Sequence, residues 1–359
     1  MSNEVQTPNS RSGSVASAWA AIDSGGFLSP MNIDRRAVGA SDVRVEIEFC
    51  GICHSDVHGA RNDWRRTTYP IVPGHEIIGT VSDIGSAVTN YEVGDRVGVG
   101  CMVDSCGECL ACTSGLEQYC ALGATFTYNS LDRRSGGRTY GGYSSHIVVD
   151  EHFVLRIPGT LDPARAAPLL CAGITTYSPL KLHGVGPASR VAVVGFGGVG
   201  SMALKLARAL GADSTVITRT DSKVARAVAS GAEAAIKFDD QKELDNVVKS
   251  FDLILDSIPV DHDLMPYLRL LKRDGTIVVL GALEPLSAPI DGMLLAANRI
   301  RITGSMMGGI GETQELLELC ATAGISSDIE EVSIGDVNRV HDQLARGDSD
   351  VRYVISSAP

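Results

Sequence analysis

The sequence predicts an α/β protein with two domains, a β-rich, barrel-like domain followed by a doubly wound parallel sheet. Two patterns along the 359 residues predict this order. From about residue 35 to 160, short alternating apolar and polar runs are separated by glycine and aspartate turns. After about residue 170, short apolar runs alternate with segments of helical spacing, which is typical of a parallel sheet covered by helices. The length is sufficient for two hydrophobic cores.

The Ser, Asn, Gly and Pro content of residues 1–20 predicts a loose arm before the fold begins. In the β-rich part, alternation with a period of two predicts half-buried strands. These strands are expected at Val43–Phe49, Ile77–Val81, Arg96–Val99 and Ser145–Val149.

The second part opens with Val191–Val194, a wholly apolar run typical of a strand covered on both faces. Further strands are expected at 215–218, 234–237, 253–256, 276–280 and 300–303, and helices at 199–210 and 222–230. A helix at 312–322 and the closing segment 351–355 are expected to return to the first domain. The predicted boundaries are therefore 1–170, 171–308 and 309–359.

Four cysteines with the spacing C-x2-C-x2-C-x7-C indicate a structural metal site. Cys106, Cys109, Cys112 and Cys120 are close enough in sequence for four thiolates to bind one tetrahedral zinc ion. A disulfide interpretation is weaker, because such close cysteines need special backbone geometry to pair. We expect a zinc lobe at about residues 101–122.

Composition excludes several functions. The net charge of -12 argues against nucleic acid or an anionic membrane as a partner. No apolar run approaches the roughly 20 residues that a membrane-spanning helix needs. The N-terminus lacks the basic and apolar regions of a secretory signal. Together with nine cysteines, this predicts reduced thiols and a cytoplasmic location.

A glycine-rich loop follows the strand at 191–194. Its residues are Gly195, Gly197, Gly198, Val199 and Gly200, in a G-x-G-x-x-G pattern between a buried strand and a helix. The first glycine permits a tight turn, the second lets a pyrophosphate approach, and the third lets helix and strand pack closely. The alternative is a glycine turn without a ligand.

The end of the next strand predicts which dinucleotide binds. An NAD site normally has a carboxylate there, whereas this chain has Thr218, Arg219, Thr220 and, further on, Lys223. A guanidinium would pair with a 2′-phosphate, so we expect NADP(H). Asp221 opposes this preference if it turns inward, and the alternative is that Arg219 is a solvated surface charge.

Cys53, His75 and Cys171 are candidate ligands of a second metal, although they are distant in sequence. From the residues alone, a buried cysteine is usually a small hydrophobe and a lone histidine usually structural. Cys50, Cys101 and Cys320 are interpreted as core thiols.

The order of several short motifs along the chain indicates a family that includes these candidate ligands. GICHSD, PGHE, GDRV, the four-cysteine lobe, LLCAGIT and GFGGVG occur in the order that resembles the zinc-dependent medium-chain alcohol dehydrogenases. GVGCMVDSC, LEQYC, TYGGYSSHIVVDE and AAPLLCAGITTYSPL are similar to the cinnamyl-alcohol-dehydrogenase branch, including its bacterial NADP-dependent members. The resemblance covers about residues 35–355. It implies a GroES-like catalytic domain, a Rossmann domain and a homodimer joined through the nucleotide domains.

The resemblance also implies residue roles. It makes Cys53, His75 and Cys171 the ligands of a catalytic zinc, so that each chain would bind two zinc ions. Glu76 corresponds to a glutamate behind the metal, and Asp56 to a carboxylate that orients the ligating imidazole.

The remaining implied roles concern proton transfer and binding. Ser55, His58 and Asp63 would pass the substrate proton to solvent. Cofactor contacts are expected from His54 at the phosphates and from Thr175, Gly281 and Ser305 at the nicotinamide. The substrate pocket would be lined by Trp64, Phe126 and Met306.

The sequence thus predicts hydride transfer between NADP(H) and a small-molecule substrate, a primary, aromatic or medium-chain alcohol or aldehyde. One alternative is an NAD-dependent polyol or formaldehyde dehydrogenase of the same superfamily. Another is a catalytically silent NADP-binding protein, because fold alone does not fix function. A zinc-lobe module for nucleic acid is disfavoured by the acidic charge.

Overall fold

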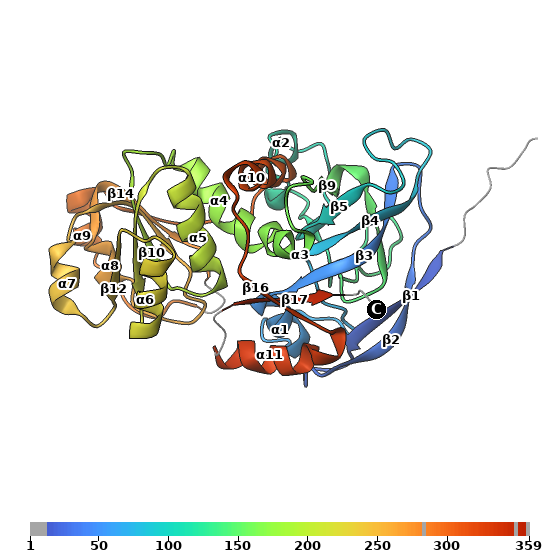
Figure 1. Ribbon diagram of the computed structural model, residues 1–359, viewed down its shortest axis with the longest axis horizontal. Helices are drawn as coiled ribbons and strands as arrows, with labels where there is room; N and C mark the ends of the chain where they lie inside the picture. The colour runs from blue at the N-terminus through green and yellow to red at the C-terminus, as the bar shows by residue number, and fades with distance from the viewer. Residues whose placement is uncertain (1–12, 282–284, 348–350, 357–359) are drawn as a thin grey trace, which may run out of the picture.

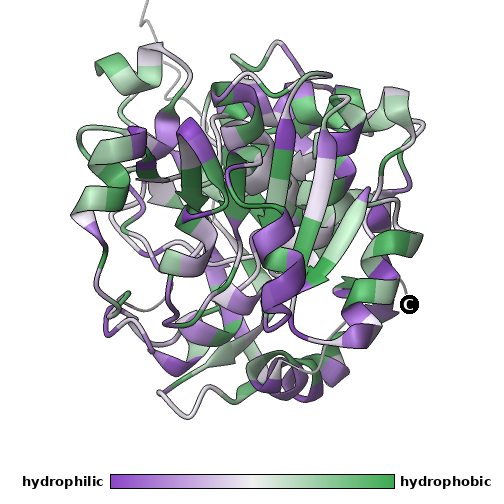
Figure 2. Ribbon diagram, turned by 90° about the vertical axis from the view of Figure 1, so that its left-hand side faces the viewer, coloured by the Kyte–Doolittle hydropathy of each residue, from purple (hydrophilic) through white to green (hydrophobic). Residues whose placement is uncertain are grey.

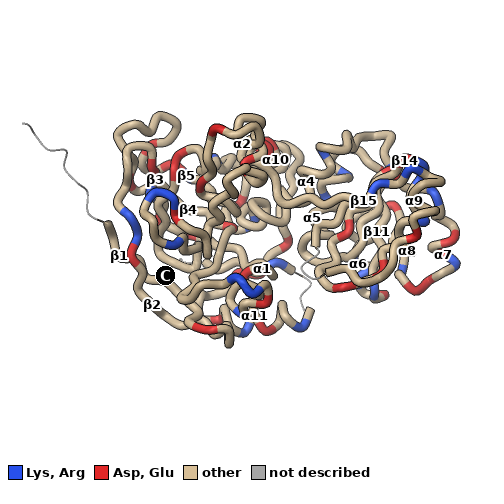
Figure 3. The backbone as a smooth tube through the Cα atoms, turned by 180° about the vertical axis from the view of Figure 1, so that it is seen from behind, with Lys and Arg blue, Asp and Glu red and all other residues tan. Residues whose placement is uncertain are grey.

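The computed structural model describes residues 13–281, 285–347 and 351–356. The molecule has two parts, one built on a seven-stranded sheet and the other on a six-stranded sheet (Figure 1). Helices α4 (Ala172–Leu182) and α10 (Ile310–Ala323) lie between the two parts. Figure 3 shows that acidic and basic residues are interspersed along both parts. None of the described helices is both long and apolar enough to cross a bilayer.

The seven-stranded sheet has the order β16-β17-β3-β4-β5-β9, with β8 also pairing with β3. Its strands are β3 (Asp42–Ile52), β4 (Ile77–Ile84), β5 (Arg96–Val99), β8 (His146–Asp150), β9 (Leu155–Arg156), β16 (Ile329–Val332) and β17 (Arg352–Ser356). The C-terminal strand β17 pairs antiparallel with β3, with Tyr353 opposite Ile52. The last strand of the chain therefore lies beside the segment that leads to Cys53. Two short strands, β6 (Met102–Asp104) and β7 (Thr125–Phe126), pair next to the cysteine lobe.

The N-terminal arm differs from the prediction. Strand β1 (Ser14–Ala21) pairs antiparallel with β2 (Leu28–Arg35), so the expectation of a loose arm through residue 20 is wrong from residue 14 onward. The rest of that arm, residues 1–12, lies outside the described residues. Ala16, Ala18 and Ala20 are buried at every second position. Alanine gives only a weak apolar signal because its side chain is small, and the preceding residues are polar. The alternation that marks β1 as a strand was therefore not recognised in the sequence.

The six-stranded sheet is wholly parallel, in the order β12-β11-β10-β13-β14-β15. Its strands are β10 (Arg190–Val194), β11 (Asp213–Thr218), β12 (Ala234–Lys237), β13 (Phe251–Asp256), β14 (Leu271–Val279) and β15 (Arg301–Gly304). Figure 2 shows largely apolar strands in the middle of this part, with helices of mixed hydropathy around them. This order reverses direction at β10, and ligands of such sheets bind at the carboxyl ends of the strands beside that point. The predicted α/β fold class is confirmed.

The helices cover the sheets and close the domains. The remaining α-helices are α1 (His54–Arg61), α2 (Leu110–Thr113), α3 (Pro163–Ala166), α5 (Gly198–Ala209), α6 (Asp221–Ala229), α7 (Gln241–Asn246), α8 (Met265–Leu268), α9 (Gly292–Asn298) and α11 (Val337–Arg346). Short 3-10 turns lie at Glu117–Tyr119, Glu151–Phe153, Ala167–Leu170 and Ile334–Asp336. Strand β14 begins earlier than predicted, because the charged residues Lys272, Arg273 and Asp274 interrupt the apolar pattern in its first half.

Candidate active site

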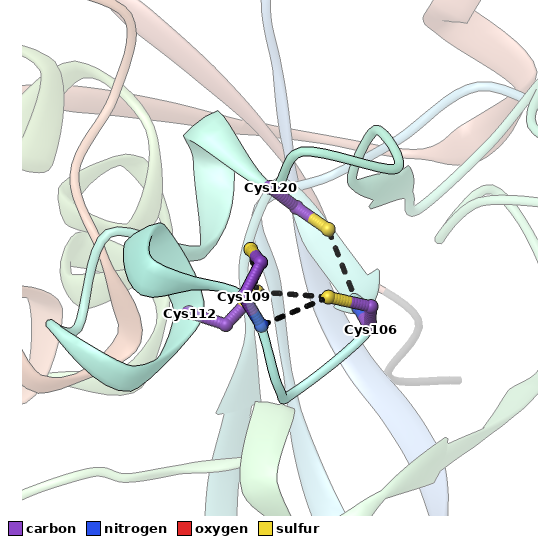
Figure 4. Close-up of side chains that lie close together, drawn as sticks. All are labelled: Cys106, Cys109, Cys112 and Cys120. Atoms are coloured by element: carbon purple, nitrogen blue, oxygen red, sulfur yellow. Dashed lines mark hydrogen bonds between the residues drawn. The ribbon is translucent and has the colours of Figure 1, made fainter.

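The four cysteines of the lobe converge on one point (Figure 4). The Sγ atom of Cys112 lies 3.8 Å from that of Cys106 and 3.5 Å from that of Cys109. A tetrahedral zinc ion with bonds of about 2.3 Å holds its sulfurs about 3.8 Å apart. Backbone N–H groups also donate to these sulfurs, and the hydrogen bond from Ala121 leads those that lower the pKa of Cys109 to about 6. The lobe therefore fits a zinc ion bound by thiolates.

A second cluster joins residues from three distant segments. Cys53 precedes α1, His75 lies in the loop before β4, and Cys171 lies at the start of α4. The Sγ atoms of Cys53 and Cys171 are 4.0 Å apart, and His75 Nε2 is 3.3 Å from Cys171 Sγ. One ligand atom from each, together with a carboxylate oxygen of Glu76, lies within 4.8 Å of all the others. Two sulfurs and one imidazole nitrogen at these distances fit three ligands of a tetrahedral zinc ion with one position open.

The electrostatics of the cluster favour a thiolate. Hydrogen bonding with Cys171, followed by His75, holds the pKa of the Cys53 thiol well below its usual value, although burial opposes this. Cys101 lies on the Cys171 side of this cluster, with its thiol 3.6 Å from the carbonyl of Leu170. Its hydrogen bond with Cys171 is the first cause that raises the pKa of Cys171 well above the ordinary range. Cys101 is therefore a neighbour of the second cluster, and not only a core thiol as the sequence suggested.

Asp56 is the fully buried carboxylate that organises this cluster. As the third residue of α1 it accepts a hydrogen bond from the backbone N–H of Cys53 at 2.8 Å, which fixes the start of the helix. It also accepts from Gly74 N at 3.0 Å, His75 Nδ1 at 3.1 Å and the Tyr143 hydroxyl at 3.2 Å. Because Nδ1 donates to Asp56, Nε2 of His75 is left to face the cysteines.

Two residues that the sequence motifs did not assign to the site extend this network. Tyr143 lies before β8 and His341 in α11, and the Tyr143 hydroxyl is 3.5 Å from His341 Nε2. Burial lowers the pKa of His341 to about 4, so its ring is neutral at ordinary pH. Since Tyr143 donates to Asp56, the neutral ring of His341 donates Nε2–H to the tyrosine oxygen. The network therefore runs from His75 to the C-terminal helix.

Glu76 and Arg352 form a buried ion pair between the second cluster and the glycine loop. Glu76 is fully buried, and burial is the main cause that raises its pKa to about 7, with the charge of Arg352 acting in the opposite direction. Arg352 comes from β17, and a Cβ atom on Gly198 would lie 2.4 Å from its Cδ atom. Arg352 thus touches both the carboxylate and the loop. Its position in a terminal strand gave no indication of this role.

The sequence-predicted relay residues lie on and just after α1. Ser55 Oγ is 3.7 Å from Cys53 Sγ, and His58 Nδ1 is 2.7 Å from Asp63 Oδ2. The rings of His54 and His58 stack with centroids 4.9 Å apart. The side chains of His58 and Asp63 are 20% and 46% exposed, so this pair is accessible to solvent.

The glycine loop has the backbone that its pattern predicts. Gly195 has φ of +88°, a conformation that favours glycine. A Cβ atom on Gly200 would lie 2.1 Å from the carbonyl oxygen of Gly195, so only glycine fits there. Gly197 caps α5, and Val199 lies in its first turn. A Cβ atom on Gly197 would meet nothing within 4 Å, so the N-terminus of α5 has room for an anionic group there.

At the end of β11, Thr218 is buried whereas Arg219 and Thr220 are exposed. Thr220 caps α6 by accepting from the backbone N–H of Lys223 at 3.3 Å. The Asp221 side chain is 92% exposed and lies 3.6 Å from Lys237. The Asp221 carboxylate therefore lies beside Lys237 of β12 and is largely exposed to solvent.

The remaining candidates come from separate segments. Thr175 lies in the first turn of α4, and Gly281 follows β14, where a Cβ atom would lie 2.7 Å from the Ser257 carbonyl. The backbone N–H of Ser305 donates to Val279 O at 3.3 Å. Of the pocket candidates, Trp64 has its ring centroid 5.5 Å from that of His58, and Phe126 lies in β7. Met306 is 43% exposed, and its backbone N–H donates to the Tyr119 hydroxyl.

Comparisons with known proteins agree with this geometry. The family model described as Alcohol dehydrogenase GroES-like domain matches residues 39–159, and the one described as Zinc-binding dehydrogenase matches residues 198–322. The chain is 49% identical to an NADP-dependent alcohol dehydrogenase C 1 of Mycolicibacterium smegmatis, over 96% of this chain and 99% of that protein. It is 47% identical to the aldehyde reductase YahK of Escherichia coli, over 92% and 95% of the two chains.

Among solved structures, a cinnamyl alcohol dehydrogenase of Sorghum bicolor has a TM-score of 0.92 and 39% identity, covering 96% of this chain and 98% of that one. The two zinc-compatible clusters, the glycine loop and these matches lead to one assignment. The chain belongs to the zinc-binding alcohol dehydrogenase family, which makes it an oxidoreductase.

Proposed function

We propose that the chain is a zinc-dependent alcohol dehydrogenase and aldehyde reductase that transfers a hydride between NADP(H) and a primary, aromatic or medium-chain alcohol or aldehyde. The observation that carries this proposal is the convergence of Cys53, His75 and Cys171, with 4.0 Å between the two sulfurs and 3.3 Å from Cys171 to the imidazole. Arg352 connects this cluster with the glycine loop through its contact with Gly198.

The residues of the chain divide the work between binding and proton transfer. A zinc ion bound by Cys53, His75 and Cys171 would supply Lewis acidity toward the substrate oxygen, and NADP(H) would carry the hydride. Ser55 is the hydroxyl closest to Cys53 in α1, and it can both accept and donate the substrate proton. His58, held by Asp63 at 2.7 Å, passes that proton to solvent.

The glycine loop and the end of β11 bind the cofactor in this proposal. The N-terminus of α5 receives the pyrophosphate, with His54 nearby, and Thr175, Gly281 and Ser305 meet the nicotinamide. Arg219 and Lys223 receive the 2′-phosphate, with Thr218 and Thr220 beside them. Relatives named as NADP-dependent support this choice over NAD.

For the substrate, an apolar pocket with Trp64, Phe126 and Met306 would favour aromatic or medium-chain compounds. The relatives' names, which include cinnamyl alcohol dehydrogenases and an aldehyde reductase, support this class. A second zinc ion, bound in the lobe by Cys106, Cys109, Cys112 and Cys120, would stabilise the structure. All nine cysteines lie within the described residues and none of them forms a disulfide, which supports a cytoplasmic location.

Two copies of the chain are proposed to associate through β15. This strand is the last in the six-stranded sheet order, and all four of its residues are exposed, including Ile302 at 38%. An exposed edge offers unpaired backbone groups to another strand. Pairing of β15 with its copy would join the two nucleotide domains edge to edge, which sedimentation can test.

The test of function is an absorbance screen of aromatic and aliphatic aldehydes with NADPH and with NADH. We expect reduction with NADPH, and Cys53→Ala should abolish it. Cys320→Ala is the matched control, because Cys320 is fully buried and forms part of the core around α10. Intact turnover in Cys53→Ala would end the zinc proposal, whereas a clear NADH preference would replace it with the NAD-dependent alternative. Absence of any reduction by the zinc-loaded protein would favour the silent binding protein.

A further inference from the structure

Lys237 lies at the carboxyl end of β12, directly beside the proposed 2′-phosphate site. In the parallel register its Cα partner is Thr218, the last residue of β11. The backbone N–H of Phe238 also donates to Thr218 O at 2.9 Å. The ends of the two strands are thus held together, and Lys237 shares the sheet edge with the turn that carries Arg219.

The ammonium group of Lys237 faces two carboxylates at this edge. Its Nζ atom is 3.6 Å from Asp221 Oδ1 and 3.7 Å from Asp239 Oδ1. Asp221 is the first residue of α6 and lies on the same turn as Arg219 and Lys223, whereas Asp239 lies beyond β12. Asp221 is therefore the carboxylate on the turn proposed to receive the 2′-phosphate.

We infer that Lys237 is a specificity-determining residue of the NADP(H) site, because it holds the Asp221 carboxylate toward β12 and neutralises its charge. The inference rests on the cofactor preference proposed above. Arg219, Lys223 and Lys237 supply three cationic side chains to this edge, and the carboxylates of Asp221 and Asp239 lie beside Lys237. Without Lys237 the Asp221 carboxylate loses the cation beside it, and the positive potential that favours a 2′-phosphate over a hydroxyl falls.

The expected effect follows from the charge of the ligand. A phosphate monoester carries nearly two negative charges at neutral pH. In a solvent-exposed site, one unit charge a few ångströms from such a group changes its binding by about five- to tenfold. An exposed ion pair of this kind adds little to folding stability, so the substitution should leave the fold intact. The effect should also weaken as salt increases.

The test measures dissociation constants of NADPH and NADH by cofactor fluorescence, together with binding of 2′,5′-ADP and AMP. Lys237→Ala should weaken NADPH and 2′,5′-ADP about five- to tenfold and leave NADH and AMP nearly unchanged. Asp221→Asn should preserve or increase the preference. In the double variant, the preference should return to within about twofold of the wild-type value, because no Asp221 charge remains to be neutralised.

Lys272→Ala is the matched control. Lys272 pairs with Asp252 at 2.8 Å near the amino ends of β13 and β14, so its removal changes the net charge equally at the opposite edge of the sheet. This variant should leave the preference unchanged.

Two results overturn the inference without touching the proposed function. One is a wild-type protein that prefers NADPH together with an unchanged preference in Lys237→Ala. The other is a loss that persists undiminished in the Asp221→Asn background, because Lys237 would then act without Asp221. A wild-type protein that prefers NADH would instead refute the proposed cofactor.

Discussion

Asp56→Asn tests how the second cysteine–histidine cluster is held together. Each oxygen of the buried carboxylate accepts two hydrogen bonds, with Cys53 N and the Tyr143 hydroxyl on Oδ2, and Gly74 N and His75 Nδ1 on Oδ1. An amide offers only one acceptor oxygen, so its NH2 group would face two of these donors. The substitution therefore removes two hydrogen bonds whichever way the amide is turned.

The magnitude follows from these contacts. Two lost hydrogen bonds to a charged group, at about 1.5–3 kcal/mol each, give about 3–6 kcal/mol of destabilisation. Burial of a neutral amide costs less than burial of a carboxylate, which reduces the expected loss to about 2–4 kcal/mol. An altered contact to a ligating histidine also typically weakens metal binding about 10- to 100-fold.

The assay combines urea unfolding of the zinc-loaded protein with the rate at which zinc passes to a coloured chelator. Asp342→Asn is the control, since Asp342 is 62% exposed and should change the unfolding free energy by less than about 0.5 kcal/mol. A loss of less than about 1 kcal/mol in Asp56→Asn, with zinc release at the wild-type rate, would show that Asp56 does not hold the cluster together.

Three other predictions concern separate parts of the chain. Arg352→Met leaves the Glu76 carboxylate buried without its cation, so urea unfolding should show a loss of about 3–5 kcal/mol, and a wild-type midpoint would contradict this. The hydrogen bond with Glu117 raises the pKa of His152 and lowers that of Glu117, although burial opposes both shifts. The histidine contribution is complete below its unfolded pKa of about 6.5 and is lost as pH rises through the raised folded value. The glutamate contribution is present above about pH 4.5 and is lost as pH falls. The thermal midpoint of the wild type should therefore exceed that of His152→Gln by more at pH 6 than at pH 8.5. The difference should be small, because the histidine side chain is mostly exposed. Equal differences at the two pH values would contradict a stabilising pair. Cys106→Ser should remove one of two zinc ions and expose residues 101–122 to limited proteolysis, and a retained count of two by metal analysis would contradict the four-cysteine site.

Much of the parallel sheet could be predicted from the sequence, because its strands carry their own signal. Val191 to Val194 are all fully buried, and the glycine loop follows them directly. Strand β1 was missed because its buried positions are small alanines and the segment before it is rich in polar residues. The start of β14 was missed because its first residues are charged.

Of the two metal sites, only the four-cysteine site could be predicted from the spacing of its residues. The four lobe cysteines lie within 15 consecutive positions, so spacing alone predicts that they meet. Cys53 and Cys171 are 118 positions apart, and only a family resemblance could join them before the structure was known.

The supporting residues carried no such signal. No motif marks His341, Arg352 or Lys237 for a role, because a sequence does not say which buried or edge group a side chain will meet. The structure brings His341 to Tyr143, Arg352 to Glu76 and Lys237 to Asp221.

Anomalous diffraction at the zinc absorption edge, from crystals grown with NADPH, would locate both metal ions and the cofactor in one experiment. We expect two peaks per chain, one among Cys106, Cys109, Cys112 and Cys120 and one among Cys53, His75 and Cys171, with the nicotinamide beside the second. A map with no peak between Cys53 and Cys171, or with the cofactor bound away from that peak, would contradict this expectation.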